Sequence, residues 1–279
     1  MMRFGPAGLR GVEKAVSNLK NYAKLGLKAC EIAFTHGVYI HSERDAEMIG
    51  KKAKELGIKL SIHAPYWINL NSSEKKKIEE SKKRIIDSCR IGELMGAEIV
   101  VFHAGFFGKG DKEEAYQNIK KAVLEMLDEI KRNKWNIRIA AETMGKINVF
   151  GSAEEILRLV KETGCGFCLD FAHLYARSLG KDSYAEIYEK FRHFPELHCH
   201  FSGIEFGDKG EKNHKLTPDD EIRKLLKVLP KNKEITIINE SPEPIKDSEK
   251  MSEVWKGLGL SEKISVKNEP PSRSKLRGI

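Results

Sequence analysis

Short apolar runs rich in β-branched residues alternate along this chain with longer amphipathic stretches. The apolar runs predict eight strands, at residues 2–6, 29–34, 59–63, 98–103, 137–142, 166–170, 197–201 and 234–239. The stretches between them predict helices at residues 12–25, 42–56, 74–95, 113–131, 153–163, 184–191, 218–229 and 248–258. Strands buried on both faces and separated by helices are typical of a parallel sheet built from βα units.

Eight such units predict an α/β fold, a single (β/α)8 TIM barrel over residues 1–260. A doubly wound open sheet is the alternative. Residues 261–279 contain a Pro pair, few apolar residues and five basic side chains, and we expect a mobile basic tail there.

Composition excludes several classes of protein. With 40% hydrophobic and 32% charged residues, the chain has enough apolar material for a core and is not disordered throughout. Its purely apolar runs are far shorter than the ~20 residues that a membrane span needs, so we expect no membrane association. The N-terminal residues lack the apolar segment of a secretory signal, which predicts a cytoplasmic protein.

Charge and cysteine content narrow the picture further. The 49 Lys and Arg exceed the 41 Asp and Glu by eight, which favours a polyanionic partner. Five cysteines, an odd number, argue against a disulfide framework. The Cys165 and Cys168 pair has the spacing of a redox motif, but it leads into a strand and is better explained by strand packing.

Histidine and acidic residues recur where the predicted strands end. In a (β/α)8 barrel these ends meet at one face, which is where active sites form. The residues at these ends, or in the segments that follow them, are His63, His103, Glu142, Asp170, His173, His198, His200, His214 and Glu240. Converging carboxylates repel one another unless cations neutralise them, and mixed imidazole and carboxylate ligands suit Zn, Mn or Fe. The sequence therefore predicts a multinuclear metal site.

These positions also carry a family resemblance. HAPYWIN at residues 63–69, FHAG at 102–105, ETMGK at 142–146, LDFAH at 169–173, HFSG at 200–203 and NES at 239–241 resemble the endonuclease IV (deoxyribonuclease IV) family. That family belongs to the xylose-isomerase-like TIM barrels, and the resemblance extends from about residue 2 to residue 260.

The resemblance implies a trinuclear zinc centre, with two or three Zn²⁺ per chain and Mn²⁺ as a substitute. His63 and His103 would hold the first ion, and Glu142 would bridge it to a second. Further ligands of the second ion would be Asp170, His200 and Glu240, and the third ion would be held by His173 and His214. The family places an Asp two residues before the last of these histidines, where this chain has Lys212 with Glu211 beside it. Either Glu211 replaces that Asp, or the third site is weakened or absent.

Strand seven offers both His198 and His200 as ligands. They face the same way on a strand but differ in depth by about 6.6 Å. His200, directly before the FSG tripeptide, matches the family better, and we expect it to be the ligand.

The resemblance implies an apurinic/apyrimidinic endonuclease of base-excision repair that cuts 5′ to an abasic site and leaves a 3′-hydroxyl. Glu142 and Glu240 would be the catalytic carboxylates. Double-stranded DNA with abasic sites would be the partner of a monomeric enzyme, contacted by Tyr66 and Asn69. Val38 and Tyr39, in a loop that departs from the family pattern, would be the wedge that enters the duplex.

Two other functions remain open. A metal-dependent sugar isomerase or epimerase on the same barrel needs a smaller ligand set, which Glu142, Asp170, His200 and Glu240 also satisfy. The additional histidines favour the nuclease. A DNA-binding protein without catalytic activity is the third possibility, because Lys212 departs from the ligand pattern.

Overall fold

The computed structural model describes residues 1–108 and 110–267. Its strands are β1 (Met2–Pro6), β2 (Ala29–Ala33), β3 (Lys59–His63), β4 (Ile99–Phe102), β5 (Arg138–Glu142), β6 (Gly166–Asp170), β7 (Glu196–Phe201), β8 (Gly203–Gly207), β9 (Gly210–Lys215) and β10 (Glu234–Asn239). Its helices are α1 (Val12–Lys24), α2 (Glu43–Leu56), α3 (Lys75–Met95), α4 (Lys112–Arg132), α5 (Ala153–Thr163), α6 (Phe171–Arg177), α7 (Tyr184–Phe191), α8 (Asp219–Val228) and α9 (Pro244–Lys267).

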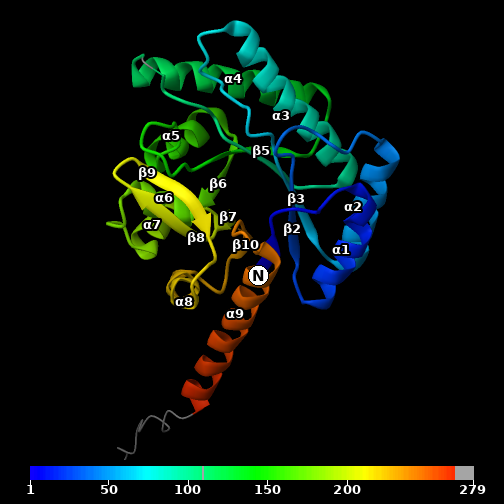
Figure 1. Ribbon diagram of the computed structural model, residues 1–279, viewed down its shortest axis with the longest axis vertical. Coiled ribbons are helices and arrows are strands. Elements are labelled where there is room, and N and C mark those ends of the chain that lie inside the picture. The colour runs from blue at the N-terminus through cyan, green and yellow to red at the C-terminus, as the bar shows by residue number, and fades with distance from the viewer. Residues whose placement is uncertain (109, 268–279) are drawn as a thin grey trace, which may run out of the picture.

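Eight of these strands form one parallel sheet in the order β1-β10-β7-β6-β5-β4-β3-β2, and the helices surround it (Figure 1). The first and last strands approach each other, with a bridge between Ala7 and Glu31 and a hydrogen bond from the Lys28 amide to the Phe4 carbonyl, 3.0 Å long. Gly5 permits this approach, because a Cβ at that position would lie 1.9 Å from the Ala29 carbonyl oxygen. The predicted (β/α)8 TIM barrel is thus confirmed.

Local sequence fixes where most helices begin and end. The hydroxyls of Ser42 and Ser152 accept hydrogen bonds from backbone N–H groups in the first turns of α2 and α5. Gly57, Gly96 and Gly164 end α2, α3 and α5 in the left-handed conformation that favours glycine. Apolar helix faces and outward strand side chains pack into one continuous core around the barrel.

Three features differ from the elements predicted above. Strands β8 and β9 form an antiparallel hairpin between β7 and α8, and α6 follows β6 directly; neither was expected from the pattern. Helix α9 begins and ends outside the predicted range 248–258, and it projects from the barrel (Figure 1). It includes part of the predicted tail, whose remaining residues, 268–279, lie outside the described part of the chain. In the described part, no helix is long and apolar enough to span a membrane.

Candidate metal centre

The strand ends carry the predicted residues to one mouth of the barrel. His63, Glu142 and Asp170 are the last residues of β3, β5 and β6, and His103 and Glu240 directly follow β4 and β10. Because neighbouring parallel strands end side by side, their terminal side chains converge. The remaining members come from β7, α6 and β9, which contribute His200, His173, Glu211 and His214.

Glu142 lies at the middle of this cluster, with its carboxylate inaccessible to solvent. Its Oε2 atom is 3.1 Å from Nε2 of His63 and 2.9 Å from Nε2 of His103. Its Oε1 atom is 3.1 Å from Nδ1 of His200 and 3.4 Å from Nδ1 of His173. One carboxylate thus faces imidazoles from four different elements, the arrangement expected of a ligand that bridges two metal ions.

A second group forms around the other carboxylates. Glu142, Asp170, His200 and Glu240 each place one ligand atom within 4.8 Å of the others. The Glu240 Oε1 atom is 3.4 Å from Nδ1 of His200. The Asp170 Oδ1 atom accepts a 2.7 Å hydrogen bond from the His173 backbone N–H, whereas its buried Oδ2 atom has no hydrogen-bond partner.

The third group depends on an irregularity in the hairpin. Asn213 pairs with Glu205 and Glu211 pairs with Phe206, so Lys212 is an extra residue in β9. Such a bulge reverses the alternation of side chains and brings residues three apart to one face. Oxygens of Glu211 therefore lie 3.5 Å from Nε2 of His173 and 4.0 Å from Nε2 of His214. The structure thus brings Glu211, and not Lys212, to these two histidines.

Neighbouring groups fix which ring nitrogen each of three histidines presents. The Nδ1 atom of His63 lies 2.7 Å from the backbone carbonyl of the next residue. The Nδ1 atom of His173 lies 2.9 Å from the backbone carbonyl of Thr143. A carbonyl only accepts, so both Nδ1 atoms carry the proton. The Nδ1 atom of His214 is 2.7 Å from the Ser202 hydroxyl, which itself donates to a backbone carbonyl. All three rings therefore turn Nε2 towards the cluster, which is the nitrogen that can bind a metal once a proton on it is displaced.

The electrostatics of the cluster favour cations. Burial opposes ionisation of Glu142, yet the imidazoles of His200 and His103 hold the pKa of its carboxyl well below its usual range. Burial raises the pKa of Asp170, where the charges of Glu142 and Glu240 add to the effect. In the described part of the chain, no Lys or Arg nitrogen comes within 4 Å of the Glu142 carboxylate.

These residues fit divalent metal ions. Buried imidazole and carboxylate ligands in three neighbouring groups, two of which share Glu142, are the donor set of Zn²⁺ or a similar transition metal. The unpartnered Asp170 Oδ2 atom is accounted for if it is a ligand. The structure brings together all eight predicted ligands, and it places His200 rather than His198 in the four-residue group.

Sequence reasoning missed Glu31. This residue lies in the middle of β2 and is inaccessible to solvent, with its Oε2 atom 3.0 Å from Nε2 of His198 and 2.8 Å from the Ser61 hydroxyl. Its Oε1 atom is 2.9 Å from Nε2 of His200. The available signal was a charged residue inside an apolar strand, in the run ACEIAF.

The mouth of the barrel opens into a cavity of about 310 Å³. Tyr66 and Phe106 contribute to its lining and are half exposed, at 48% and 50%, while the neighbouring Trp67 is 69% exposed. Asn69 has a local role, because its Oδ1 atom accepts a 3.1 Å hydrogen bond from the Asn71 backbone N–H within the same loop.

The predicted wedge residues Val38 and Tyr39 lie in the loop after β2 and do not line this cavity. Both are half-buried and pack against the hydrophobic core. The Tyr39 ring meets the buried Phe34 ring edge to face at 5.3 Å, and burial raises the pKa of its hydroxyl to about 12. The exposed aromatic residues at the mouth are thus not the pair that the sequence singled out.

The fold and the convergent ligand groups define a metal-binding enzyme on a TIM barrel. Residues 19–257 match the Xylose isomerase-like TIM barrel family, and the chain belongs to that family. It is 37% identical over 230 residues to the uncharacterized protein MJ0133 of Methanocaldococcus jannaschii, covering 77% of this chain and 81% of that protein. A probable endonuclease 4 of Mycobacterium leprae is 28% identical over 128 residues, which cover 46% of this chain and about half of that protein.

Solved structures show the same fold at low sequence identity. A structure described as SacUVDE has a TM-score of 0.74 at 19% identity, covering 93% of this chain and 99% of that one. A D-tagatose 3-epimerase-like protein has a TM-score of 0.70 at 20% identity, covering 94% and 100%. Endonuclease IV from Thermus thermophilus has a TM-score of 0.68 at 20% identity, covering 93% and 99%.

Proposed function

We propose that this protein is a metal-dependent endonuclease that hydrolyses the DNA backbone 5′ to an abasic site and leaves a 3′-hydroxyl. The observation that carries the proposal is the third ligand group, His173, Glu211 and His214, which adjoins the two groups that share Glu142. A sugar isomerase has no need of this additional set. The partial similarity to a probable endonuclease 4 supports the same activity.

Divalent ions in this centre would lower the pKa of a bound water and stabilise the charge that develops on a phosphodiester. In that reaction, Glu142 joins two of the ligand groups through its two carboxylate oxygens. Glu240, which is partly accessible at the mouth, would orient the attacking water. His63 and His103 face the open cavity, where a phosphate would enter.

The surroundings of the mouth suit a nucleic acid. Lys146 lines the cavity, and the chain as a whole carries an excess of eight positive charges, which supports binding to a phosphate backbone. Tyr66, Trp67 and Phe106 present aromatic faces on which a base can stack. An abasic nucleotide enters such a pocket cheaply, because no base has to be unpaired.

A sugar epimerase or isomerase is the second candidate. The group of Glu142, Asp170, His200 and Glu240 is complete by itself. The cavity of about 310 Å³ also has the size of a small-molecule site, and the fold resembles that of a D-tagatose 3-epimerase-like protein.

Cleavage of a labelled duplex with one stable abasic-site analogue tests the proposal. We expect the metal-loaded protein to cut 5′ to the lesion, chelator to prevent cutting, and Glu142→Ala to lack it. Glu253→Ala, which removes an exposed carboxylate from α9, is the control and should cut like the wild type. An intact duplex with metal bound would reject the nuclease in favour of the epimerase, and a retarded but uncut duplex would indicate a binding protein.

A further inference from the structure

A polar layer lies directly beneath the metal centre, inside the barrel. TIM-barrel interiors are mostly filled by bulky branched side chains. Here Glu31 of β2, Ser61 of β3 and His198 of β7 meet instead, with the Glu31 Oε2 atom 2.8 Å from the Ser61 hydroxyl and 3.0 Å from Nε2 of His198. On β7 this layer lies two residues before His200, deeper inside the barrel. The proposed nuclease mechanism does not use it.

The layer contains a set of metal-binding donors. Cys168, His198 and His200 place ligand atoms within 4.8 Å of one another, and Glu31 adds a carboxylate that touches both imidazoles. The Glu31 Oε1 atom and the His200 Nε2 atom are 2.9 Å apart and fully buried, yet neither has a hydrogen-bond partner. Two such atoms, close together but off the line of an N–H bond, would have to move apart by only about 0.4–0.7 Å to become neighbouring ligands of one tetrahedral ion with bonds of ~2.0–2.2 Å.

Cys168 differs from the other four cysteines of the chain. Cys30, Cys89, Cys165 and Cys199 pack into the continuous hydrophobic cluster, whereas Cys168, which is also buried, lies outside that cluster. The explanation by strand packing therefore suits Cys165 better than Cys168, whose thiol lies beside the His200 ring. Its thiol belongs to the donor cluster.

We propose that Glu31, Cys168, His198 and the Nε2 atom of His200 form a second, deeper metal site of the Zn²⁺ type. Cysteine, histidine and carboxylate are the ligands of tetrahedral zinc. A divalent ion neutralises a carboxylate and a thiolate that are otherwise costly to bury. His200 would then serve both sites as an imidazolate, with Nδ1 towards the outer centre and Nε2 towards the inner ion, after metal binding releases both ring protons to solvent.

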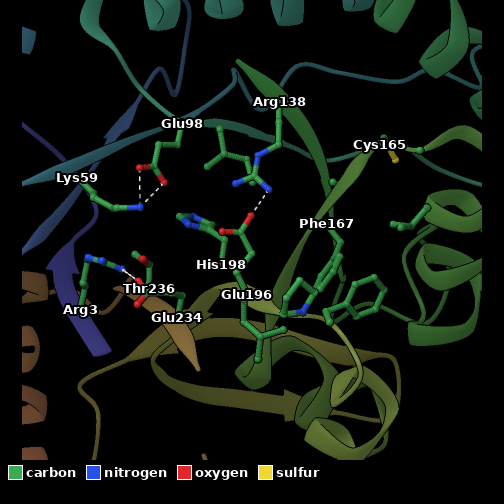
Figure 2. A pocket seen from close by; sticks show the side chains of 17 residues that line it. Arg3, Lys59, Glu98, Arg138, Cys165, Phe167, Glu196, His198, Glu234 and Thr236 are labelled. Carbon is green, nitrogen blue, oxygen red and sulfur yellow. Dashed lines mark hydrogen bonds and ion pairs between the residues drawn. The ribbon is translucent and has the colours of Figure 1, made fainter. Parts of the chain in front are cut away.

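The opposite end of the barrel gives access to this site. A cavity of about 230 Å³ opens at the N-terminal ends of the strands, and His198 forms part of its lining (Figure 2). Around the His198 ring lie three ion pairs between strands: Arg3 with Glu234 at 2.6 Å, Lys59 with Glu98 at 2.6 Å, and Arg138 with Glu196. An ion would therefore reach the inner site from the face opposite the substrate mouth.

Cobalt spectroscopy tests this site separately from the outer centre. The outer ligand groups contain no sulfur, so a thiolate-to-cobalt charge-transfer band in the near ultraviolet reports the inner site alone. We expect freshly reduced, metal-free protein titrated with Co²⁺ to show this band. Cys168→Ser should lack it and bind about one ion fewer per chain. Cys199→Ser is the matched control, because Cys199 lies between the two histidines on β7 but faces the core, and it should keep the band.

Absence of the band from wild-type protein that binds Co²⁺ would overturn the proposal, and Glu31 would then only orient the His200 ring. The same conclusion would follow if Cys168→Ser kept the band. Because absence of the band from the wild type is decisive without any variant, a variant that fails to fold does not rescue the idea. Glu142→Ala should lose DNA cleavage but keep the band, so the nuclease and the inner site fail independently.

Discussion

Glu211 is the residue on which the third ligand group depends, because its carboxylate faces both His173 and His214. Glu211→Gln keeps the size of the side chain and removes its charge. We expect the number of tightly bound ions to fall by about one per chain, with the ligands around Glu142 unaffected. Metal analysis of purified protein measures this loss. Lys212→Ala is the control, since the Lys212 side chain is exposed, and it should bind as many ions as the wild type. An unchanged ion count in Glu211→Gln would show that no third ion is held here.

Single residues at strand ends could be predicted from the sequence, because a strand's end fixes where its last side chain lies. His63, Glu142 and Asp170 needed only the strand boundaries to be placed at one mouth. Glu31 and Cys168 could not be assigned in the same way. Both lie inside strands, and their role depends on which side chains meet across the barrel, which one sequence does not reveal.

The β8–β9 hairpin shows how an element can compensate for a change in spacing. The endonuclease IV pattern separates its carboxylate and histidine by two residues, as on one face of a regular strand, whereas this chain separates them by three. The extra residue, Lys212, forms the bulge that restores a common face. Neither the hairpin nor the bulge was predicted, because β8 and β9 are short, polar and poor in β-branched residues.

The bulge predicts what deletion of Lys212 should do to the third ligand group. The shortened strand would have Glu211 and His214 two positions apart without a bulge, again on one face. We therefore expect the deletion variant to bind as many metal ions as the wild type and to retain any cleavage of abasic DNA. Metal analysis with circular dichroism checks both ion content and folding. Loss of an ion from a folded deletion variant would mean that the bulge itself, rather than the shared face, is required.

At the scale of the whole molecule, the two ends of the barrel carry different chemistry. Imidazoles, carboxylates and exposed aromatic rings lie at the mouth formed by the C-terminal ends of the strands. At the opposite end, ion pairs between side chains surround His198. The overall architecture was predictable because eight repeats of strand and helix leave few arrangements open. The specific reaction was not, because the group of Glu142, Asp170, His200 and Glu240 suits a nuclease and a sugar epimerase alike.

The buried cluster also sets the pH dependence of folding once metal is removed. Neighbouring acidic groups overcome burial and raise the pKa of His63, His173 and His200 above the usual 6.5. Each of these histidines stabilises the fold fully below its unfolded pKa, and that contribution is lost as pH rises through the raised value. Burial raises the pKa of Asp170, which adds to the loss as pH rises. Glu142 has a lowered pKa, so its contribution is present above its unfolded value of 4.5 and is lost in acid.

Metal-free protein should therefore be most stable between the pKa values that its carboxylates and histidines have in the unfolded chain, at about pH 4.5–6.5. It should lose stability towards alkaline pH. Metal-loaded protein should behave in the opposite way over the neutral range, because protons compete with metal ions for the same imidazoles. Thermal unfolding followed by circular dichroism, with and without chelator, measures both curves. A melting temperature of the metal-free protein that climbs from mildly acidic to alkaline pH would show that the histidines are not held as cations against Glu142. The carboxylates of the metal-free cluster would then have to be neutralised in another way.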